Sequence, residues 1–227
     1  MEANNITSDK FVRSFGRVKA RRLSQHKKDL FENLLPEYQI DAQSLSQLNT
    51  NSKEIHLEIG FGFGDFIFEN AKKNPDKLFI GCEPHINGVV NLLAKVEQKP
   101  LDNLKIFVGD GRIFLDEIPD HFFNRIYILN PDPWPKTKHQ KRRLVNKEFL
   151  EFLHTKIKPN NYLNIATDSN IYKEWVMREY FRTKMWNWVA RSKYDWKRFP
   201  KNWVKTKYQK KAEIAGRENA FLQFIAG

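Results

Sequence analysis

The stretch IHLEIGFGFGD, residues 55–65, places a short apolar run directly before three glycines at alternate positions. The run has the composition of a buried strand. Gly60, Gly62 and Gly64 would let the backbone approach a ligand closely at a strand-to-helix turn, although a tight turn without a ligand explains a glycine triplet equally well. The stretch therefore predicts a strand that ends in a candidate binding turn.

The position of the acid in this turn separates two classes of ligand. A dinucleotide-binding fingerprint has the spacing G-x-G-x-x-G and aims a helix N-terminus at a pyrophosphate. This chain has E-x-G-x-G-x-G, in which Glu58 would repel a phosphate and attract a cation. S-adenosylmethionine carries a sulfonium and an ammonium group and has no phosphate. The spacing favours that cofactor and argues against a nicotinamide-dependent dehydrogenase.

Outward from the turn, apolar runs alternate with stretches of helical periodicity. We predict strands at 55–60, 78–83, 104–110, 125–130 and 162–168, and helices at 65–74, 86–99, 146–157 and 170–181. This alternation predicts an α/β fold with a Rossmann-like, doubly wound and mostly parallel sheet. Two C-terminal runs, 186–191 and 219–225, are predicted to supply two further, antiparallel strands.

Acids stand at the ends of the first three predicted strands. Glu83 follows the second strand, where it could accept hydrogen bonds from a ribose diol, and Asp110 follows the third, where it could meet an adenine amino group. Ligands of doubly wound sheets bind beyond the carboxyl ends of the strands. Any one of these acids could instead cap a helix. Three together in a basic chain favour a cofactor site.

The fourth predicted strand leads into NPDPWPKTKHQKRR, residues 130–143. Its three prolines stiffen a loop that carries Asp132 and Trp134, and a dense cationic run follows at once. An acid, an aromatic ring and adjacent cations suit a site that holds a flat base and grips phosphates. A proline-rich connector with Trp134 packed in the core explains the prolines but not Asp132. Packing and stacking on the base both remain open for Trp134.

Charge and composition limit the class of protein. The chain of 227 residues has a formal net charge of +12 and a pI of about 9.6, which commonly indicates a polyanionic partner and otherwise serves solubility. The single cysteine, Cys82, excludes an internal disulfide, and no histidine pair has metal-ligand spacing, so we expect no metal. No apolar run could span a bilayer, which favours a cytoplasmic protein without membrane association.

Residues 1–52 form a basic, polar arm that ends in an amphipathic segment at residues 30–38. Its cations are Arg13, Arg17, Lys19, Arg21, Arg22, Lys27 and Lys28. A solvated helix face explains this composition as well as an RNA contact does.

Several motifs together closely resemble the bacterial tRNA (guanine-N7-)-methyltransferase family. They are EIGFGFG (58–64), PDPWPKTKHQKRR (131–143), ATD (166–168), TKYQ (206–209) and RSFGR (13–17). The resemblance covers nearly the whole chain. It implies a class I methyltransferase fold over residues 53–227, S-adenosylmethionine as cofactor, and methylation of N7 of guanine 46 in the variable loop of tRNA.

The resemblance also implies roles for individual residues. Glu58, Glu83 and Asp110 would bind the cofactor together with the three glycines, and Asp132 would be the active-site acid that also borders the cofactor. The substrate contacts would be Lys136, Asp168, Thr206, Lys207, Tyr208 and Gln209, and the RNA-binding segment Lys138, His139, Gln140, Lys141, Arg142 and Arg143. Gln209 departs from the glutamate usual in this family, which leaves its contact open. No obligatory protein partner is implied, so the protein would be a monomer or a homodimer.

Two other functions fit parts of the sequence. An enzyme that methylates an exocyclic amino group of adenine has a motif loosely similar to NPDPW, but the inserted Asp132 argues against it. A non-catalytic RNA-binding protein with a relict Rossmann-like fold would have no reason to keep Glu58, Glu83 and Asp110 together.

Overall fold

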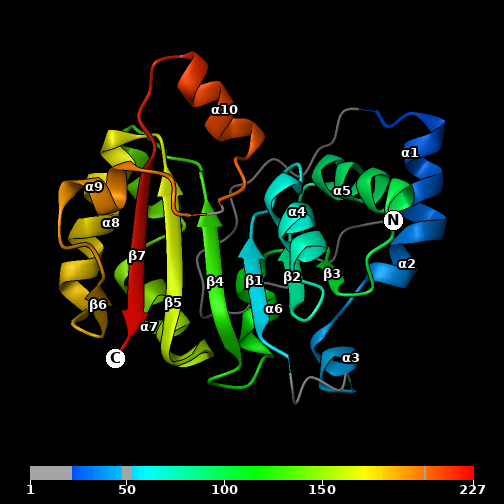
Figure 1. The fold of residues 1–227 in the computed structure, drawn as a ribbon, viewed down its shortest axis with the longest axis horizontal. Helices are drawn as coiled ribbons and strands as arrows, with labels where there is room; N and C mark the ends of the chain where they lie inside the picture. Colours follow the sequence, from blue (N-terminus) through cyan, green and yellow to red (C-terminus); the bar gives the residue numbers. More distant parts are fainter. Residues whose placement is uncertain (1–21, 48–52, 202) are drawn as a thin grey trace.

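A seven-stranded sheet forms the centre of the protein in the computed structural model, which describes residues 22–47, 53–201 and 203–227 (Figure 1). The strands are β1 (Ile55–Ile59), β2 (Leu78–Cys82), β3 (Leu104–Phe107), β4 (Phe123–Leu129), β5 (Ile157–Thr167), β6 (Trp186–Trp188) and β7 (Ala220–Ala226). Their order across the sheet is β3-β2-β1-β4-β5-β7-β6. The pairs from β3 to β5 are parallel, and β7 is antiparallel to both β5 and β6.

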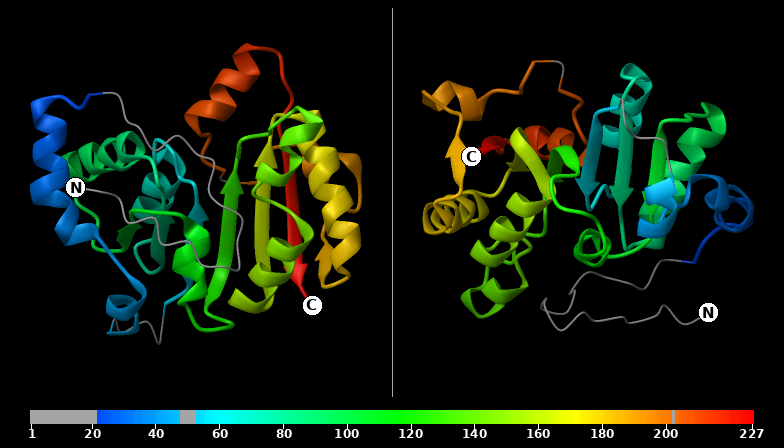
Figure 2. Two further views of the ribbon diagram at one scale, coloured as in Figure 1. Left: turned by 180° about the vertical axis from the view of Figure 1, so that it is seen from behind. Right: turned by 90° about the horizontal axis from the view of Figure 1, so that it is seen from below.

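Helices connect the strands and cover both faces of the sheet (Figures 1 and 2). They are α1 (Gln25–Asp29), η1 (Leu30–Leu34), α2 (Leu35–Tyr38), α3 (Ala42–Gln47), α4 (Asp65–Lys73), α5 (Ile86–Gln98), α6 (Gly111–Asp116), η2 (Thr137–Arg142), α7 (Lys147–Lys156), α8 (Asn170–Thr183), α9 (Lys193–Lys197) and α10 (Lys207–Ile214). Here η1 is a turn of π-helix and η2 a 3₁₀ helix.

The two faces of the sheet bury different apolar clusters because side chains alternate along each strand. Leu57 and Ile80 pack in one cluster with residues of α6, α7 and α8. Phe79 and Ile106 pack in another with residues of α4 and α5. All five residues of β1 are buried, as expected for a central parallel strand covered on both sides.

The strand order reverses beside β1, and this reversal positions the site. From β1 the chain passes through α4 to β2 and β3 on one side, and then returns through α6 to β4 on the other side. The loops after β1 and β4 therefore leave the sheet at the same edge and diverge from each other. Ligands of open α/β sheets bind in the crevice that such a reversal creates.

The predicted strands and long helices are confirmed. The five parallel strands and the helices α4, α5, α7 and α8 lie where the apolar periodicity places them, and β6 and β7 make antiparallel pairs. The sequence patterns missed the short helices α6, α9 and α10. These helices offer too few turns to show a period, and their ends are set by capping side chains such as Asp110 and Thr206.

The described part of the N-terminal arm packs into the domain core. Leu30, Leu35 and Tyr38 are buried against α5 and β3, and the backbone N–H of Ile40 donates to the carbonyl of Ile106 at 3.0 Å. Arg22 and Lys28 are exposed. Lys27 is half-buried and donates to Oδ1 of Asn91 at 3.0 Å. Arg13, Arg17, Lys19 and Arg21, and the RSFGR motif at 13–17, lie outside the described residues. The boundary of the arm at residue 52 stays a prediction.

Gly64 should be the glycine of the turn that tolerates a side chain least. Its φ is +71°, and an added Cβ would lie 2.8 Å from Cδ1 of Leu92. Gly216 has a similar φ of +68° with nothing within 4 Å, so it provides a matched control. We expect Gly216→Ala to cost about 1–2 kcal/mol of unfolding free energy from its left-handed backbone. Gly64→Ala should cost about 1–3 kcal/mol more because it also overpacks the core.

Urea unfolding of both variants measures this difference. Equal losses would show that Leu92 moves aside and that only the backbone conformation matters at Gly64.

Candidate active site

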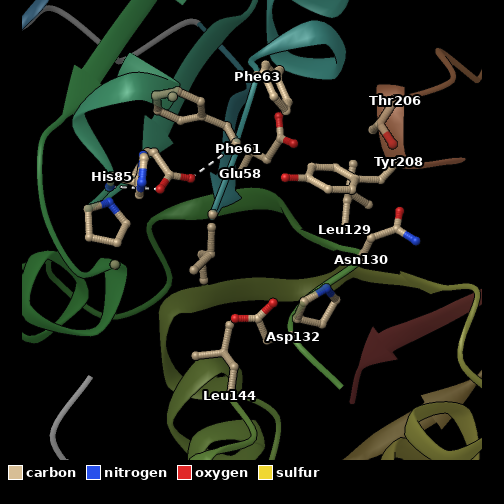
Figure 3. Close-up of a pocket in the computed structure, with 18 of the residues that line it drawn as sticks. Glu58, Phe61, Phe63, His85, Leu129, Asn130, Asp132, Leu144, Thr206 and Tyr208 are labelled. Carbon is tan, nitrogen blue, oxygen red and sulfur yellow. Dashed lines mark hydrogen bonds between the residues drawn. The ribbon is translucent and has the colours of Figure 1, made fainter. Parts of the chain in front are cut away.

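A cavity of about 820 Å³ opens at the edge of the sheet where β1, β2, β3 and β4 end (Figure 3). Residues from five separate segments line it, so no single motif builds it. They include Glu58, Gly60 and Gly62 after β1, Glu83 after β2, Asp110 after β3, Asp132, Trp134, Lys141 and Arg142 after β4, and Thr206, Lys207 and Tyr208 at the start of α10. The cavity therefore brings together most of the predicted site residues.

The glycine turn forms one wall of the cavity. Gly60 and Gly62 have φ values of +74° and +56°, which L-residues rarely adopt. The backbone N–H of Gly62 donates to Oε2 of Glu83 at 2.8 Å, so the second strand's acid also shapes the first strand's turn. Gly64 does not line the cavity. It lies behind the wall, where it begins α4 and packs against Leu92.

Glu58 is the most deeply buried acid of the cavity. Its side chain is 3% exposed, and its buried Oε2 has no hydrogen-bond partner among the described residues. Burial, followed by the charges of Glu83 and Asp65, raises the pKa of Glu58 well above its usual range. An unpaired, desolvated carboxylate oxygen at a cavity wall suits a cationic or hydrogen-bond-donating ligand.

Glu83 and Asp110 are held more firmly. Glu83 accepts hydrogen bonds from the backbone of Gly62 and of His85, at 2.8 and 2.9 Å, which oppose the rise of its pKa caused by burial. Asp110 caps α6 by accepting from the backbone N–H of Arg112, whose guanidinium also donates to both carboxylate oxygens. Asp110 thus caps a helix and lines the cavity at once.

The loop after β4 forms the opposite wall. Asp132 is exposed and faces the cavity across from Glu58 (Figure 3). Trp134 is half-buried, with the guanidinium of Arg142 4.9 Å from its ring centroid and His139 edge-on at 5.6 Å. The backbone is left-handed at Asn130 and Trp134, with φ of +51° and +40°. Trp134 therefore lines the rim of the site and is not packed in the core.

The start of α10 overhangs the glycine turn. The ring of Tyr208 lies 5.9 Å from that of Phe63 and would touch a Cβ added at Gly62 at 3.5 Å. The backbone N–H of Lys207 donates to Oδ2 of Asp65 at 3.1 Å, which ties α10 to the first turn of α4. Tyr208 consequently points into the cavity from the side of α10 (Figure 3).

Gln209 and Asp168 lie outside the cavity. Gln209 is fully buried, and its Oε1 accepts from the backbone N–H of Thr206 and from Nε1 of Trp203, at 3.1 and 3.0 Å. Its side chain therefore holds the start of α10 and does not face a ligand in this structure. Asp168 accepts from Asn130 at 3.3 Å and from Nε of Arg217 at 2.7 Å, so it supports the β4 loop from the next strand.

The basic run divides into outward and inward members. Lys136, Lys138 and Lys141 are exposed, whereas His139, Gln140 and Arg142 are half-buried. Arg143 is only 4% exposed. Its Nε and Nη2 donate to the carbonyl oxygens of Pro133 and Trp134, at 3.0 and 3.1 Å. This burial argues against the predicted RNA contact of Arg143, because two of its donors are used inside the fold.

Sequence patterns did not single out several residues of the cavity. Phe61, Phe63 and Asp65 belong to the glycine turn, His85 follows Glu83, and Leu144 follows the basic run. Their closeness in the sequence to predicted site residues is the signal that could have identified them. Among the described residues, no cluster of His, Cys, Asp and Glu could hold a metal, and no helix is long and apolar enough to cross a membrane.

Solved structures with the same fold identify the class. The chain aligns with the 30S ribosomal A1408 methyltransferase from an uncultured bacterium, at a TM-score of 0.55 and 19% identity over 83% of this chain and 95% of that chain. It aligns with the 16S rRNA methyltransferase KamB at 0.55 and 14%, over 82% and 94%. The fold is that of the class I S-adenosylmethionine-dependent methyltransferases.

Sequence comparisons then define the family. A family model described as "Putative methyltransferase" matches residues 52–222. The tRNA (guanine-N(7)-)-methyltransferase of Agrobacterium fabrum is 38% identical over 93% of this chain and 94% of its own length, and that of Zymomonas mobilis is 34% identical over 93% of both. The chain belongs to the tRNA (guanine-N7-)-methyltransferase family. This confirms the predicted enzyme class and sets aside a dehydrogenase or a relict RNA-binding protein.

Burial of Glu58 should make stability depend on pH. Because the pKa of Glu58 is raised in the folded state, the stability linked to this group is fully present below its ordinary value of 4.5 and is lost as pH rises through the folded value. We expect Glu58→Gln to be more stable than the wild type at neutral pH, with a difference that grows as pH increases above 4.5.

Urea unfolding at a series of pH values measures this difference. Glu117→Gln, at an exposed position, is the control for the loss of one carboxylate. A difference between Glu58→Gln and the wild type that does not change with pH would contradict the destabilising burial.

Proposed function

We propose that this chain transfers the methyl group of S-adenosylmethionine to N7 of guanine 46 in tRNA. One observation carries the proposal: Asp132 faces Glu58 and Glu83 across one cavity, beside an exposed run of cations. The names of the relatives supply tRNA, the base and the atom that is methylated, and position 46 follows from the family.

The lining of the cavity fits S-adenosylmethionine. The unpartnered Oε2 of Glu58 could receive the ammonium group, and the left-handed turn leaves space at Gly60 for close approach of the ligand. Glu83 and Asp110 present carboxylates at the next two strand ends, where a ribose diol and an adenine amino group could donate. A protein with a similar fold, the W203A mutant of the 16S rRNA (adenine(1408)-N(1))-methyltransferase from Catenulisporales acidiphilia, was crystallised with this cosubstrate. When bound, it supplies an electrophilic methyl group on sulfur.

Asp132 supplies the chemistry on the base. Guanine N7 already has an in-plane lone pair, so methylation requires no general base. The carboxylate can accept hydrogen bonds from N1–H and the N2 amino group of guanine, which orients N7 toward the cofactor. As the ring becomes cationic, the same carboxylate stabilises the developing charge. Positioning of the two reactants can contribute on the order of 7–11 kcal/mol.

The polar rim would hold the RNA. We assign phosphate contacts to Lys138, His139, Gln140, Lys141 and Arg142, and substrate contacts to Lys136, Thr206, Lys207 and Tyr208. Asp168 would act from outside the cavity through its hydrogen bond with Asn130, and Gln209 through the start of α10. Guanine 46 would have to turn out of the folded tRNA, at a cost of a few kcal/mol.

The setting of the enzyme follows from its substrate. A protein that modifies tRNA would act in the cytoplasm. We propose that it acts as a monomer or a homodimer without an obligatory partner of another kind.

Replacing the carboxylate at Asp132 tests the catalytic assignment. Asp132→Asn should lower kcat for methyl transfer to unmodified tRNA by about 100-fold or more, because an amide cannot balance the charge that develops on the ring. Chemical cleavage at N7-methylguanosine reports the product and its position. Affinity for S-adenosylhomocysteine should stay unchanged, and exposed Asp102→Asn is the control. Full turnover of Asp132→Asn would overturn the role.

The salt dependence of tRNA binding tests the cationic rim. The double variant Lys138→Ala with Lys141→Ala should reduce the slope of log K against log salt concentration by about 1.4–1.8, for two lost phosphate contacts. Lys73→Ala with Lys99→Ala removes the same charge from the ends of α4 and α5, near the opposite edge of the sheet. The control pair should leave the slope unchanged. Equal slopes for both double variants would show that Lys138 and Lys141 lie on a solvated surface and do not contact phosphates.

A further inference from the structure

Arg143 differs from every other cation of the run at 136–143 because it points inward. It is 4% exposed, whereas Lys136, Lys138 and Lys141 are exposed and Arg142 is half-buried at the cavity rim. Within the described residues it has no carboxylate partner. Burial of a guanidinium without a counter-charge costs folding free energy unless its N–H groups are hydrogen-bonded. The partners of the N–H groups of Arg143 therefore indicate its role.

The donors of Arg143 bind the backbone that follows Asp132. Nε donates to the carbonyl of Pro133 and Nη2 to the carbonyl of Trp134, at 3.0 and 3.1 Å. These two carbonyls belong to the first two residues after the acid. The planar fork of a guanidinium fixes the directions of both carbonyls at once, which the single ammonium of a lysine cannot do.

The backbone at this point needs such support. Trp134 has a φ of +40°, which is rare for a bulky residue and persists only where the surroundings enforce it. Asn130, at the start of the loop, is also left-handed, and its side chain donates to Asp168. The loop that carries Asp132 is thus held in an unfavourable conformation from both of its ends.

Arg143 is itself held by a rigid stack on α8. Its guanidinium lies 4.5 Å from the ring centroid of Trp175, and that of Arg178 lies 4.2 Å from the same ring. Nε1 of Trp175 donates to the carbonyl of Val145 at 2.6 Å.

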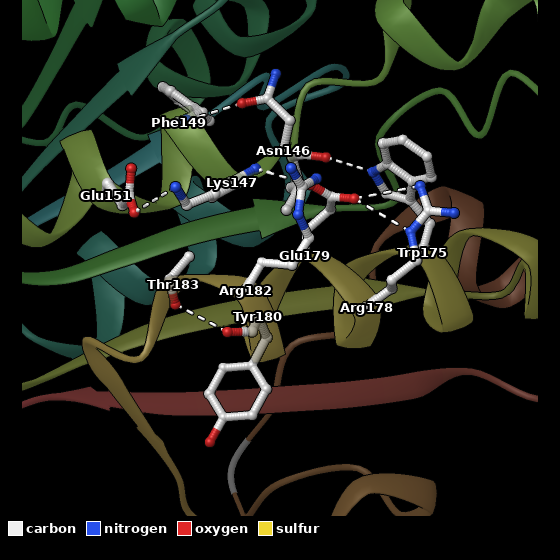
Figure 4. Close-up of polar contacts among 11 residues, drawn as sticks. Asn146, Lys147, Phe149, Glu151, Trp175, Arg178, Glu179, Tyr180, Arg182 and Thr183 are labelled. Carbon is white, nitrogen blue, oxygen red and sulfur yellow. Dashed lines mark hydrogen bonds and ion pairs between the residues drawn. The ribbon is translucent and has the colours of Figure 1, made fainter.

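Glu179 anchors the far end of this stack. It is 1% exposed and accepts from Arg178, from Arg182 and from the backbone N–H of Lys147 (Figure 4). A continuous set of contacts therefore joins α7 and α8 to the loop of Asp132.

We propose that Arg143 is a positioning residue for Asp132, which it serves by holding the carbonyls of Pro133 and Trp134, and that it does not contact RNA. The inference rests on the proposed function of the Asp132 site. It gives two adjacent arginines different roles. Arg142 lies over the ring of Trp134 at the cavity rim, and Arg143 holds the backbone carbonyls of Pro133 and Trp134.

The test compares Arg143→Lys with Arg191→Lys, an exposed arginine between β6 and α9, in steady-state methylation of unmodified tRNA. Arg143→Lys keeps the charge and loses the fork, so we expect kcat to fall about 10–100-fold. Affinity for S-adenosylhomocysteine and the salt slope of tRNA binding should both stay at wild-type values. Arg191→Lys should retain kcat to within about threefold, because Arg191 is exposed and lies outside the cavity lining.

Chemical rescue separates positioning from general damage. Arg143→Ala should lose more activity than Arg143→Lys and recover at least several-fold with millimolar methylguanidinium, but not with methylammonium. A kcat of Arg143→Lys equal to the wild type would overturn the inference. So would a salt slope reduced by one phosphate contact, because it would place Arg143 on the RNA.

A readout without catalysis keeps the inference testable if the proposed function fails. In protein labelled with 5-fluorotryptophan, the ¹⁹F resonance of Trp134, assigned through Trp134→Phe, should shift or broaden in Arg143→Lys and stay unchanged in Lys141→Ala. An unchanged resonance in Arg143→Lys would show that the loop does not depend on this arginine. Wild-type protein that forms no N7-methylguanosine would instead refute the proposed function while this spectrum still reports on the loop.

Discussion

The parallel pairing of β1 with β4 is the constraint on which the rest of the site depends. Their register sets Ile59 beside Ile128, so both strands end at the same edge of the sheet. The strand order reverses at this pair, and the two following loops therefore diverge and leave a crevice between them. Glu58 and the glycine turn form one wall, and Asp132 forms the other. Glu58 and Asp132 are more than seventy positions apart in the sequence, yet they line the same cavity because β1 and β4 end side by side.

The burial and mutual repulsion of the acids in the crevice lower the stability of the folded protein. Burial removes the hydration of the Glu58 carboxylate, whose Oε2 has no described hydrogen-bond partner, and Glu83 and Asp65 add repulsion. In a chain with a net charge of +12, cations could have neutralised them. Arg112 does so at Asp110, and Lys95 does so at Asp65. Oε2 of Glu58 has no described partner, and under the proposed function the binding energy of a cationic ligand can offset its burial.

Sequence patterns predicted the sheet and the acids that follow its strands at the cavity, because both depend on local signals. Apolar runs of strand length end in acids or glycines, and parallel strands bring those ends together without further information. Short helices were missed because capping side chains set them. The direction of side chains within the basic run was also missed. Residues 142 and 143 are adjacent and both are arginines, yet Arg142 lines the rim of the cavity and Arg143 is buried beneath it.

The sequence by itself determined the class of fold, the acids at the strand ends and the stiff, proline-rich loop, since each follows from periodicity, spacing or restricted backbone angles. Tertiary structure alone decided which polar groups face the ligand and which hold the others. Gln209 lies within a motif expected to bind substrate, but Trp203 and the backbone of Thr206 use its amide oxygen. Arg143 lies within a run expected to bind RNA, but the carbonyls of Pro133 and Trp134 use its guanidinium. The physical reason is that a polar side chain binds the partners that packing brings within reach, and those partners come from distant or differently directed segments.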